Sequence, residues 1–157
     1  MNYISKLLLA LCLVAGLGAA TTATAQIDDD TSIRANIPYA FVVGSTQLPA
    51  GKYTIQVADD YSDLNLMVIR SDDGRTAVFF ETEDAVANGT PRKGELVFNK
   101  IGNKYFLSQI FLKGDNSGNQ VVESKMEQND KAGGTTAEKH SVAGELGRAI
   151  KSVKKLG

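Results

Sequence analysis

The pattern that most constrains the fold of this chain is an alternation of apolar and polar side chains over residues 33–43. Successive side chains of a β-strand point to opposite faces, so a period of two places the apolar set on one face of an extended strand. Pro38 has no amide proton for a ladder hydrogen bond, and we therefore expect this strand to lie at a sheet edge or to bend near Pro38. The apolar set is Ile33, Ala35, Ile37, Tyr39, Phe41 and Val43.

Five further segments have strand character and follow one another across short turns. Residues 71–74 and the pair Gly102-Asn103 are hairpin signals, because glycine adopts the positive φ that tight turns require. Pro49 and Gly51 mark another turn, with proline at its second position and glycine at its fourth. The expected strands are residues 52–57, 64–70, 76–82, 94–101 and 104–113.

Three short runs are apolar at both parities: residues 78–80, 105–107 and 110–112. Strands with such runs are expected to be central and covered on both faces. Six strands in hairpin succession predict a mainly β fold. The predicted architecture is an antiparallel β-sandwich or a partly closed barrel of about six to seven strands over residues 32–125.

The composition changes toward the C-terminus, where residues 126–135 contain Gly133-Gly134 and indicate a flexible linker. Residues 121–128 fit either a last short strand or a helical turn. Residues 136–157 are predicted to form a basic amphipathic helix, because apolar residues recur at helical spacing over 142–156. We expect its apolar side to dock on the sheet; the alternatives are a mobile tail and a contact with a membrane or an acidic partner. The basic residues opposite the apolar stripe are Arg148, Lys151, Lys154 and Lys155.

The N-terminal 25 residues have the character of a cleaved signal peptide. Lys6 precedes the apolar run 7–18, and residues 23–25 supply the small side chains that a signal peptidase accepts. The run is too short to span a bilayer, which takes about 20 apolar residues. We therefore expect an exported protein, periplasmic or extracellular, with residues 26–31 as a polar leader. Cys12, the only cysteine, lies within the signal, so the mature chain has no thiol.

Charge and composition exclude several classes of function. The chain has 17 Lys and Arg residues against 18 Asp and Glu residues, a balance that gives no reason to expect nucleic-acid binding. His140 is the only histidine, so no zinc site of ordinary composition can form. Carboxylates gather at predicted turns, where aspartate is favoured because it bonds the local backbone. A calcium site is the alternative for one group, Asp59, Asp60 and Asp63.

The residues therefore indicate a non-enzymatic envelope or extracellular protein of structural or interaction type, without a cofactor or a metal. The alternative is an extracellular module that binds a polysaccharide or another ligand. Tyr61 is the candidate contact for such a ligand, because it is the only Tyr or Phe of the mature chain in a predicted loop. The identity of a partner does not follow from these residues.

Four segments in order carry a resemblance to a known family: residues 37–44 (IPYAFVVG), 48–53 (LPAGKY), 70–75 (RSDDGR) and 105–109 (YFLSQ). The chain resembles a family of small exported β-rich proteins that are numerous in acidobacterial genomes. The resemblance covers residues 33–125, and it implies export and a sandwich-like fold. It supplies no catalytic residues.

Overall fold

The computed structural model of the chain describes residues 31–58 and 65–148. Within these ranges the chain forms ten strands and one helix, and the predicted mainly β class is confirmed. The elements are β1 (Thr31–Ile37), β2 (Phe41–Val43), β3 (Thr46–Leu48), β4 (Gly51–Val57), β5 (Leu66–Ser71), β6 (Ala77–Val86), β7 (Gly94–Ile101), β8 (Lys104–Phe111), β9 (Ser117–Val121), α2 (Lys125–Ala132) and β10 (Glu138–Arg148).

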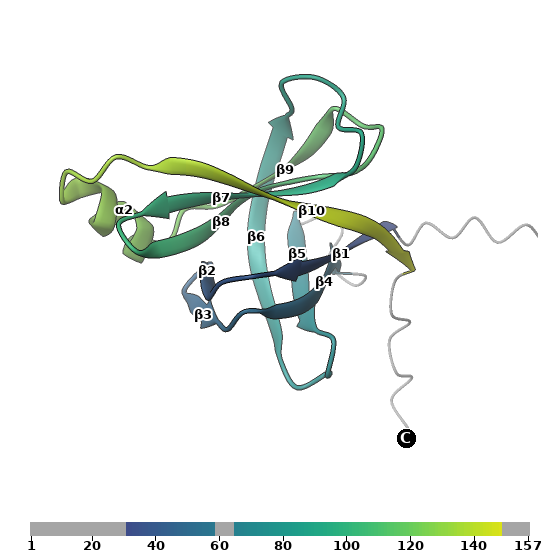
Figure 1. Cartoon of the computed structure of the whole chain (residues 1–157), viewed down its shortest axis with the longest axis horizontal. Helices are drawn as coiled ribbons and strands as arrows, with labels where there is room; N and C mark the ends of the chain where they lie inside the picture. The colour runs from purple at the N-terminus through teal and green to yellow at the C-terminus, as the bar shows by residue number, and fades with distance from the viewer. Residues whose placement is uncertain (1–30, 59–64, 149–157) are drawn as a thin grey trace, which may run out of the picture.

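Eight of the strands close into an antiparallel barrel in the order β8-β7-β10-β1-β4-β5-β6-β9, with β9 pairing back to β8 (Figure 1). The remaining two strands, β2 and β3, form a hairpin that joins β8 in parallel at Phe106. Closure pairs strand edges that would otherwise be open to other chains. The architecture is thus a closed barrel with more strands than the six or seven expected.

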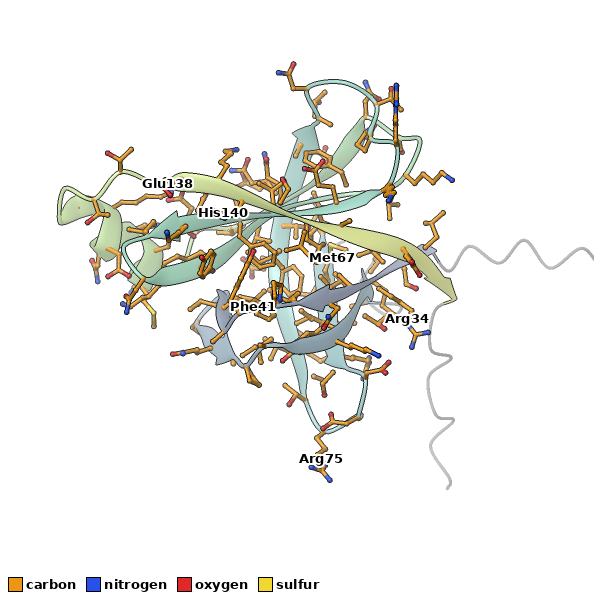
Figure 2. The ribbon with its side chains drawn as sticks, viewed as in Figure 1. Arg34, Phe41, Met67, Arg75, Glu138 and His140 are labelled. Carbon is orange, nitrogen blue, oxygen red and sulfur yellow. The ribbon has the colours of Figure 1, made fainter. Side chains whose placement is uncertain are left out.

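The barrel interior is filled by the alternating residues of the first predicted strand and their cross-strand neighbours. Ile33 and Ile37 are buried, whereas Arg34 between them is exposed, as the period of two predicts. β1 ends at Ile37 and the chain resumes as β2 after Pro38, which confirms the expected interruption there. Phe41 of β2 packs edge-to-face on Tyr53 and on Phe98, so the β2–β3 hairpin adds to the same core (Figure 2).

The two hairpin signals are confirmed. Gly74 has a φ of 71° in the turn between β5 and β6, and Gly102 has a φ of 62° between β7 and β8. The expected strand 94–101 coincides with β7, and the others agree to within a few residues apart from β6, which runs on to Val86. Local turn chemistry therefore specifies these connections well.

The expectation that the doubly apolar runs are covered on both faces holds for β8 and is wrong for β6. In β8, Phe106, Leu107, Ile110 and Phe111 are all buried. In β6, Phe80 points into the core, but its neighbour Phe79 is 54% exposed on the outer face. The two strands differ because the outer side of β8 is covered: Phe106 packs in a second apolar cluster with Val42 and Ile101. Phe79 of β6 belongs to neither apolar cluster and stays exposed.

The predicted helix over residues 136–157 is wrong for the part that the structure describes. Glu138–Arg148 is a strand, β10, which pairs with β7 on one side and with β1 on the other (Figure 1). Two ladders outweigh the local helical spacing, which Gly144 and Gly147 already weaken. Gly144 also serves the strand: a Cβ there would meet the Cδ1 of Ile33 at 2.6 Å. Residues 149–157 lie outside the described ranges.

The predicted linker over residues 126–135 is also corrected, because Lys125–Ala132 forms helix α2. Ser124 caps its N-terminus by accepting a hydrogen bond from the Glu127 amide at 3.2 Å. Of the two expected alternatives for 121–128, the structure contains both in sequence: β9 ends at Val121, and a helix follows. The predicted signal, residues 1–25, and residues 26–30 of the predicted leader lie outside the described residues, whereas Thr31, the last residue of that leader, begins β1.

Candidate functional site

Most residues that the sequence singled out do not enter the described structure. Tyr61, Lys151, Lys154 and Lys155 lie outside the described ranges, as do the aspartates of the hypothetical calcium site. Arg148 is the last residue of β10, so it belongs to a strand and not to the basic face of a helix. The structure therefore brings none of these residues together within its described part.

His140 lies on β10, near Glu138 of the same strand (Figure 2), and pairs with Phe98 of β7. Its ring meets Tyr105 edge-on at 5.5 Å between centroids, and Tyr105 stacks on Tyr39 at 3.7 Å. Glu138 Oε2 is 3.7 Å from His140 Nε2. Burial, followed by the proximity of Tyr105, raises the pKa of Tyr39 above 10.0. A phenol held in its protonated form serves packing better than proton transfer at neutral pH.

The carboxylates of the β5–β6 turn have the structural role expected of them. Asp73 accepts hydrogen bonds from the Ser71 hydroxyl at 2.6 Å and from the Arg75 amide at 3.1 Å. These bonds, the first from Ser71, lower the pKa of Asp73 below 3.8. Among the described residues, no group of three or more His, Cys, Asp or Glu side chains is placed to hold a metal ion.

A groove of about 550 Å³ lies on the outer face of β6, and we call it the β6 groove. Three of its apolar side chains are unusually exposed for their size: Phe79 by 54%, Val122 by 41% and Met126 by 39%. Such residues gathered in one hollow are typical of interaction sites, whereas isolated ones are common on any surface. The lining is Gly44, Ser45, Leu66, Phe79, Phe80, Glu81, Val122, Ser124, Lys125 and Met126.

Four segments far apart in the sequence build the β6 groove: the β2–β3 turn at Gly44 and Ser45, β5, β6, and the stretch from Val122 into α2. Phe79 faces outward from β6 because its neighbour Phe80 faces inward. Leu66 of β5 lies opposite Glu81 and shares this outer face. Val122 follows β9, and Met126 lies in the first turn of α2. Sequence reasoning missed this site because a period-two pattern does not tell whether a second layer covers an outward aromatic residue.

A second groove, of about 390 Å³, lies where β7 begins and β8 ends. Arg92, Lys93 and Lys113 line it and are all exposed, and none of the three forms an ion pair with another residue of the described ranges. Leu146 and Glu145 of β10 lie on its other side. This basic groove is a local concentration of positive charge that the nearly neutral overall composition conceals.

Helix α2, which contributes one wall of the β6 groove, is fastened to the barrel by a buried carboxylate. Glu127 Oε1 accepts a hydrogen bond from Asn99 Nδ2 of β7 at 2.8 Å, and Lys131 Nζ lies 3.2 Å from the same oxygen. Lys131 also pairs with Glu123. A buried charge is tolerated only with such partners, so the three contacts form one unit.

The ion pairs of Lys131 lead to a prediction about alkaline stability. Burial alone lowers the pKa of Lys131, but the hydrogen bonds and attraction of Glu123 and Glu127 outweigh it and raise the pKa above 10.5. A raised pKa stabilises the fold at all pH values below the unfolded pKa, and this contribution is lost as the pH rises through the folded pKa. We expect wild type to lose more free energy of unfolding than Lys131→Met between about pH 9 and about pH 11.5 in urea titrations. Equal losses in the two proteins would contradict this role.

Comparison of the chain with protein-family models, with curated proteins and with solved structures finds no match. Across residues 31–58 and 65–148, no helix has the length and apolar character needed to cross a membrane. The groove geometry is therefore the basis on which a function is proposed.

Proposed function

We propose that this is an exported, non-enzymatic protein of interaction type that binds a partner protein through the β6 groove. The observation that carries the proposal is the 54% exposure of Phe79 beside Met126 and Val122 in one hollow. Aromatic residues and Met are enriched at protein–protein interfaces, and burying a side chain such as Phe contributes about 1.5–3 kcal/mol. A partner that fills the groove removes this surface from water.

The exposed apolar side chains of the β6 groove favour a protein partner over a sugar. Ser45, Glu81, Ser124 and Lys125 also line the groove. Its most exposed apolar side chains are Phe79, Val122 and Met126, and aromatic residues and Met are enriched at protein–protein interfaces. The non-enzymatic part of the proposal is supported by the surroundings of His140, whose side chain contacts the Glu138 carboxylate and the Tyr105 ring. Neither is a nucleophile that His140 would activate in acyl transfer.

Export is supported by the N-terminal sequence, in which Lys6, the apolar run 7–18 and the small residues 23–25 have the order of a cleaved signal. The mature chain without cysteine is consistent with a periplasmic or extracellular protein that depends on a packed core in place of disulfides. The partner in this proposal is accordingly another exported or envelope protein.

The alternative is a module that binds an extracellular polysaccharide, and the basic groove favours an acidic one. Arg92, Lys93 and Lys113 would meet its carboxylate or sulfate groups. Opposite them, Glu145 repels an anion from the same groove. We rank this function second because its contacts are exposed charges, which solvent screens.

The proposal is tested with a photo-crosslinking phenylalanine analogue at position 79 in the producing cell. We expect a discrete adduct with one exported protein, identified by mass spectrometry. The matched control is the same analogue at position 83, because Glu83 is exposed on the same face of β6 but is not part of the groove lining. The purified partner should then bind wild type and lose at least about tenfold in affinity for Phe79→Asp, since a carboxylate in an apolar contact is desolvated without a partner.

Two results would overturn the proposal. The first is an adduct pattern that is the same at positions 79 and 83. The second is a purified partner whose affinity is unchanged by Phe79→Asp. Adducts that contain only carbohydrate would favour the polysaccharide alternative.

A further inference from the structure

Strand β6 has ten residues, but its ladder with β9, which closes the barrel, covers only the second half of the strand. It pairs with β5 over Ala77–Glu81 and with β9 over Thr82–Val86. Beyond Val121 one more bond continues the β9 ladder, from the Val122 amide to the Glu81 carbonyl at 3.1 Å. The chain then turns away at Ser124 to begin α2. Within the described residues, the edge of β6 from Ala77 to Phe80 therefore has no neighbouring strand on this side.

The hydrogen bonds on either side show which backbone groups this edge presents. The Thr82 amide bonds to Asn65 and the Thr76 carbonyl to the Ser71 amide, so the even-numbered residues turn toward β5. The Glu81 carbonyl bonds to Val122 on the opposite side. Backbone groups of an antiparallel strand alternate between its two edges. It follows that the N–H and C=O groups of Ala77 and Phe79 point to the unpaired edge.

This edge lacks the features by which proteins usually protect exposed strand edges. Residues 76–80 read Thr-Ala-Val-Phe-Phe and include no charge and no proline. An uncharged, β-prone edge of this kind is open to pairing with another extended chain. Phe79, whose backbone lies on the edge, also places its side chain in the β6 groove.

We propose that an extended segment of the partner protein adds to β6 at Ala77–Phe80, antiparallel to it and in line with β9; this inference rests on the proposed function. Main-chain hydrogen bonds to Ala77 and Phe79 supply binding, and every second side chain of the segment enters the β6 groove. Lys125 is exposed at the rim of the groove and forms no ion pair within the described ranges. Glu81 is likewise exposed in the lining and forms no ion pair within these ranges. The segment is therefore apolar at alternate positions and carries an acidic residue that pairs with Lys125 and a basic residue that pairs with Glu81.

The first part of the test uses amide hydrogen exchange on the purified protein. In the free protein, the amides of Ala77 and Phe79 exchange fast, because no strand covers them. The amides of Glu83 and Ala85 exchange slowly, since they face β9 on the same edge. These two residues are an internal control on the same strand. Slow exchange at Ala77 and Phe79 in a free monomer would contradict the proposal.

The second part uses a phage-displayed library of random peptides of about twelve residues, panned against the immobilised protein. We expect enriched sequences that alternate apolar and polar residues and include an acid. Binding slows exchange at Ala77 and Phe79 only. The best peptide is then synthesised with single N-methyl groups along its backbone. Methylation at every second residue, where the amide faces β6, should weaken binding by about tenfold or more, and methylation between these positions should change it little.

The outcomes separate this inference from the function on which it rests. If peptide binding depends on Phe79 but N-methylation has no alternating effect, strand addition is overturned. The interaction function is retained in that case. Pairing of two copies of this chain, seen as a dimer that Phe79→Asp dissociates, would replace the proposed occupant. If no peptide in the library binds wild type more tightly than Phe79→Asp, strand addition is overturned. A crosslinked adduct at position 79 in cells would still support partner binding through the β6 groove.

Discussion

Gly118→Ala is expected to destabilise the protein by about 3 kcal/mol or more, because Gly118 lies where the barrel closes. It pairs with Phe111 of β8 on one side and with Ala85 of β6 on the other. A Cβ at this position would collide with the Phe111 ring and would lie 2.6 Å from the carbonyl oxygen of Ile110. Backbone cannot yield without breaking the β8–β9 ladder. Urea unfolding followed by circular dichroism measures the loss.

Gly133→Ala is the matched control for this substitution. Gly133 has a φ of −69°, which alanine adopts freely, and its Cβ would come no closer than 3.4 Å to the carbonyl oxygen of Asp130. We expect the free energy of unfolding to change by less than about 0.5 kcal/mol. Similar losses of stability for Gly118→Ala and Gly133→Ala would contradict the collision of a Cβ at position 118 with β8.

Phe98→Ala is expected to lower the free energy of unfolding by about 3–5 kcal/mol. Phe98 has an exposure of 0%, and its ring meets Tyr39 and Phe41 edge-on at 5.4 and 5.6 Å between centroids. Removing it leaves a cavity between β7 and the β2–β3 hairpin, and close packing prevents the neighbours from filling it fully. Thermal and urea unfolding of the variant give the magnitude.

The comparison variant is Phe79→Ala, which removes the same side chain from a surface position. With 54% of Phe79 already exposed, we expect a loss of less than about 1 kcal/mol together with loss of the partner. A stability loss for Phe79→Ala as large as that for Phe98→Ala would mean that Phe79 serves the fold and not an interface. The pair thus separates packing from binding with a single type of substitution.

The core of the barrel was largely accessible to prediction from the sequence. The odd-numbered apolar residues from Ile33 to Ile37 are buried as the period of two requires, and β7 has the predicted bounds. Gly74 and Gly102 mark hairpins that form as expected, both with positive φ. These features depend on residues next to one another along the chain, and so local patterns are sufficient to identify them.

The C-terminal region shows where local patterns mislead. Val142 and Leu146 recur at a helical interval, yet both lie in β10. What decides the conformation is the vacancy between β7 and β1, which are distant in sequence from β10 and offer it two ladders. Gly144 fits there because Ile33 leaves no room for a side chain. Similarly, α2 depends on the buried contact of Glu127 with Asn99 of β7.

The candidate site was outside the reach of sequence patterns for the same reason. Phe79 was predicted to be covered, and its exposure depends on which elements pack against the outer face of β6. The β6 groove combines the β2–β3 turn, β5, β6 and the stretch from Val122 into α2. The unpaired edge at Ala77 arises from the turn of the chain at Ser124. None of these relations is encoded by the spacing of neighbouring residues.

By itself, the sequence determined the β class, the hairpins at Gly74 and Gly102, and the inward face of β1, because side-chain alternation and glycine torsions are properties of short segments. Only the tertiary structure decided that the barrel closes through β9 and β10, that the tail from Glu138 is a strand, and that Phe79 stays uncovered. The physical reason is that strand pairing and burial are settled between segments far apart in the chain, where the hydrogen bonds and apolar area gained in the whole fold outweigh local preference.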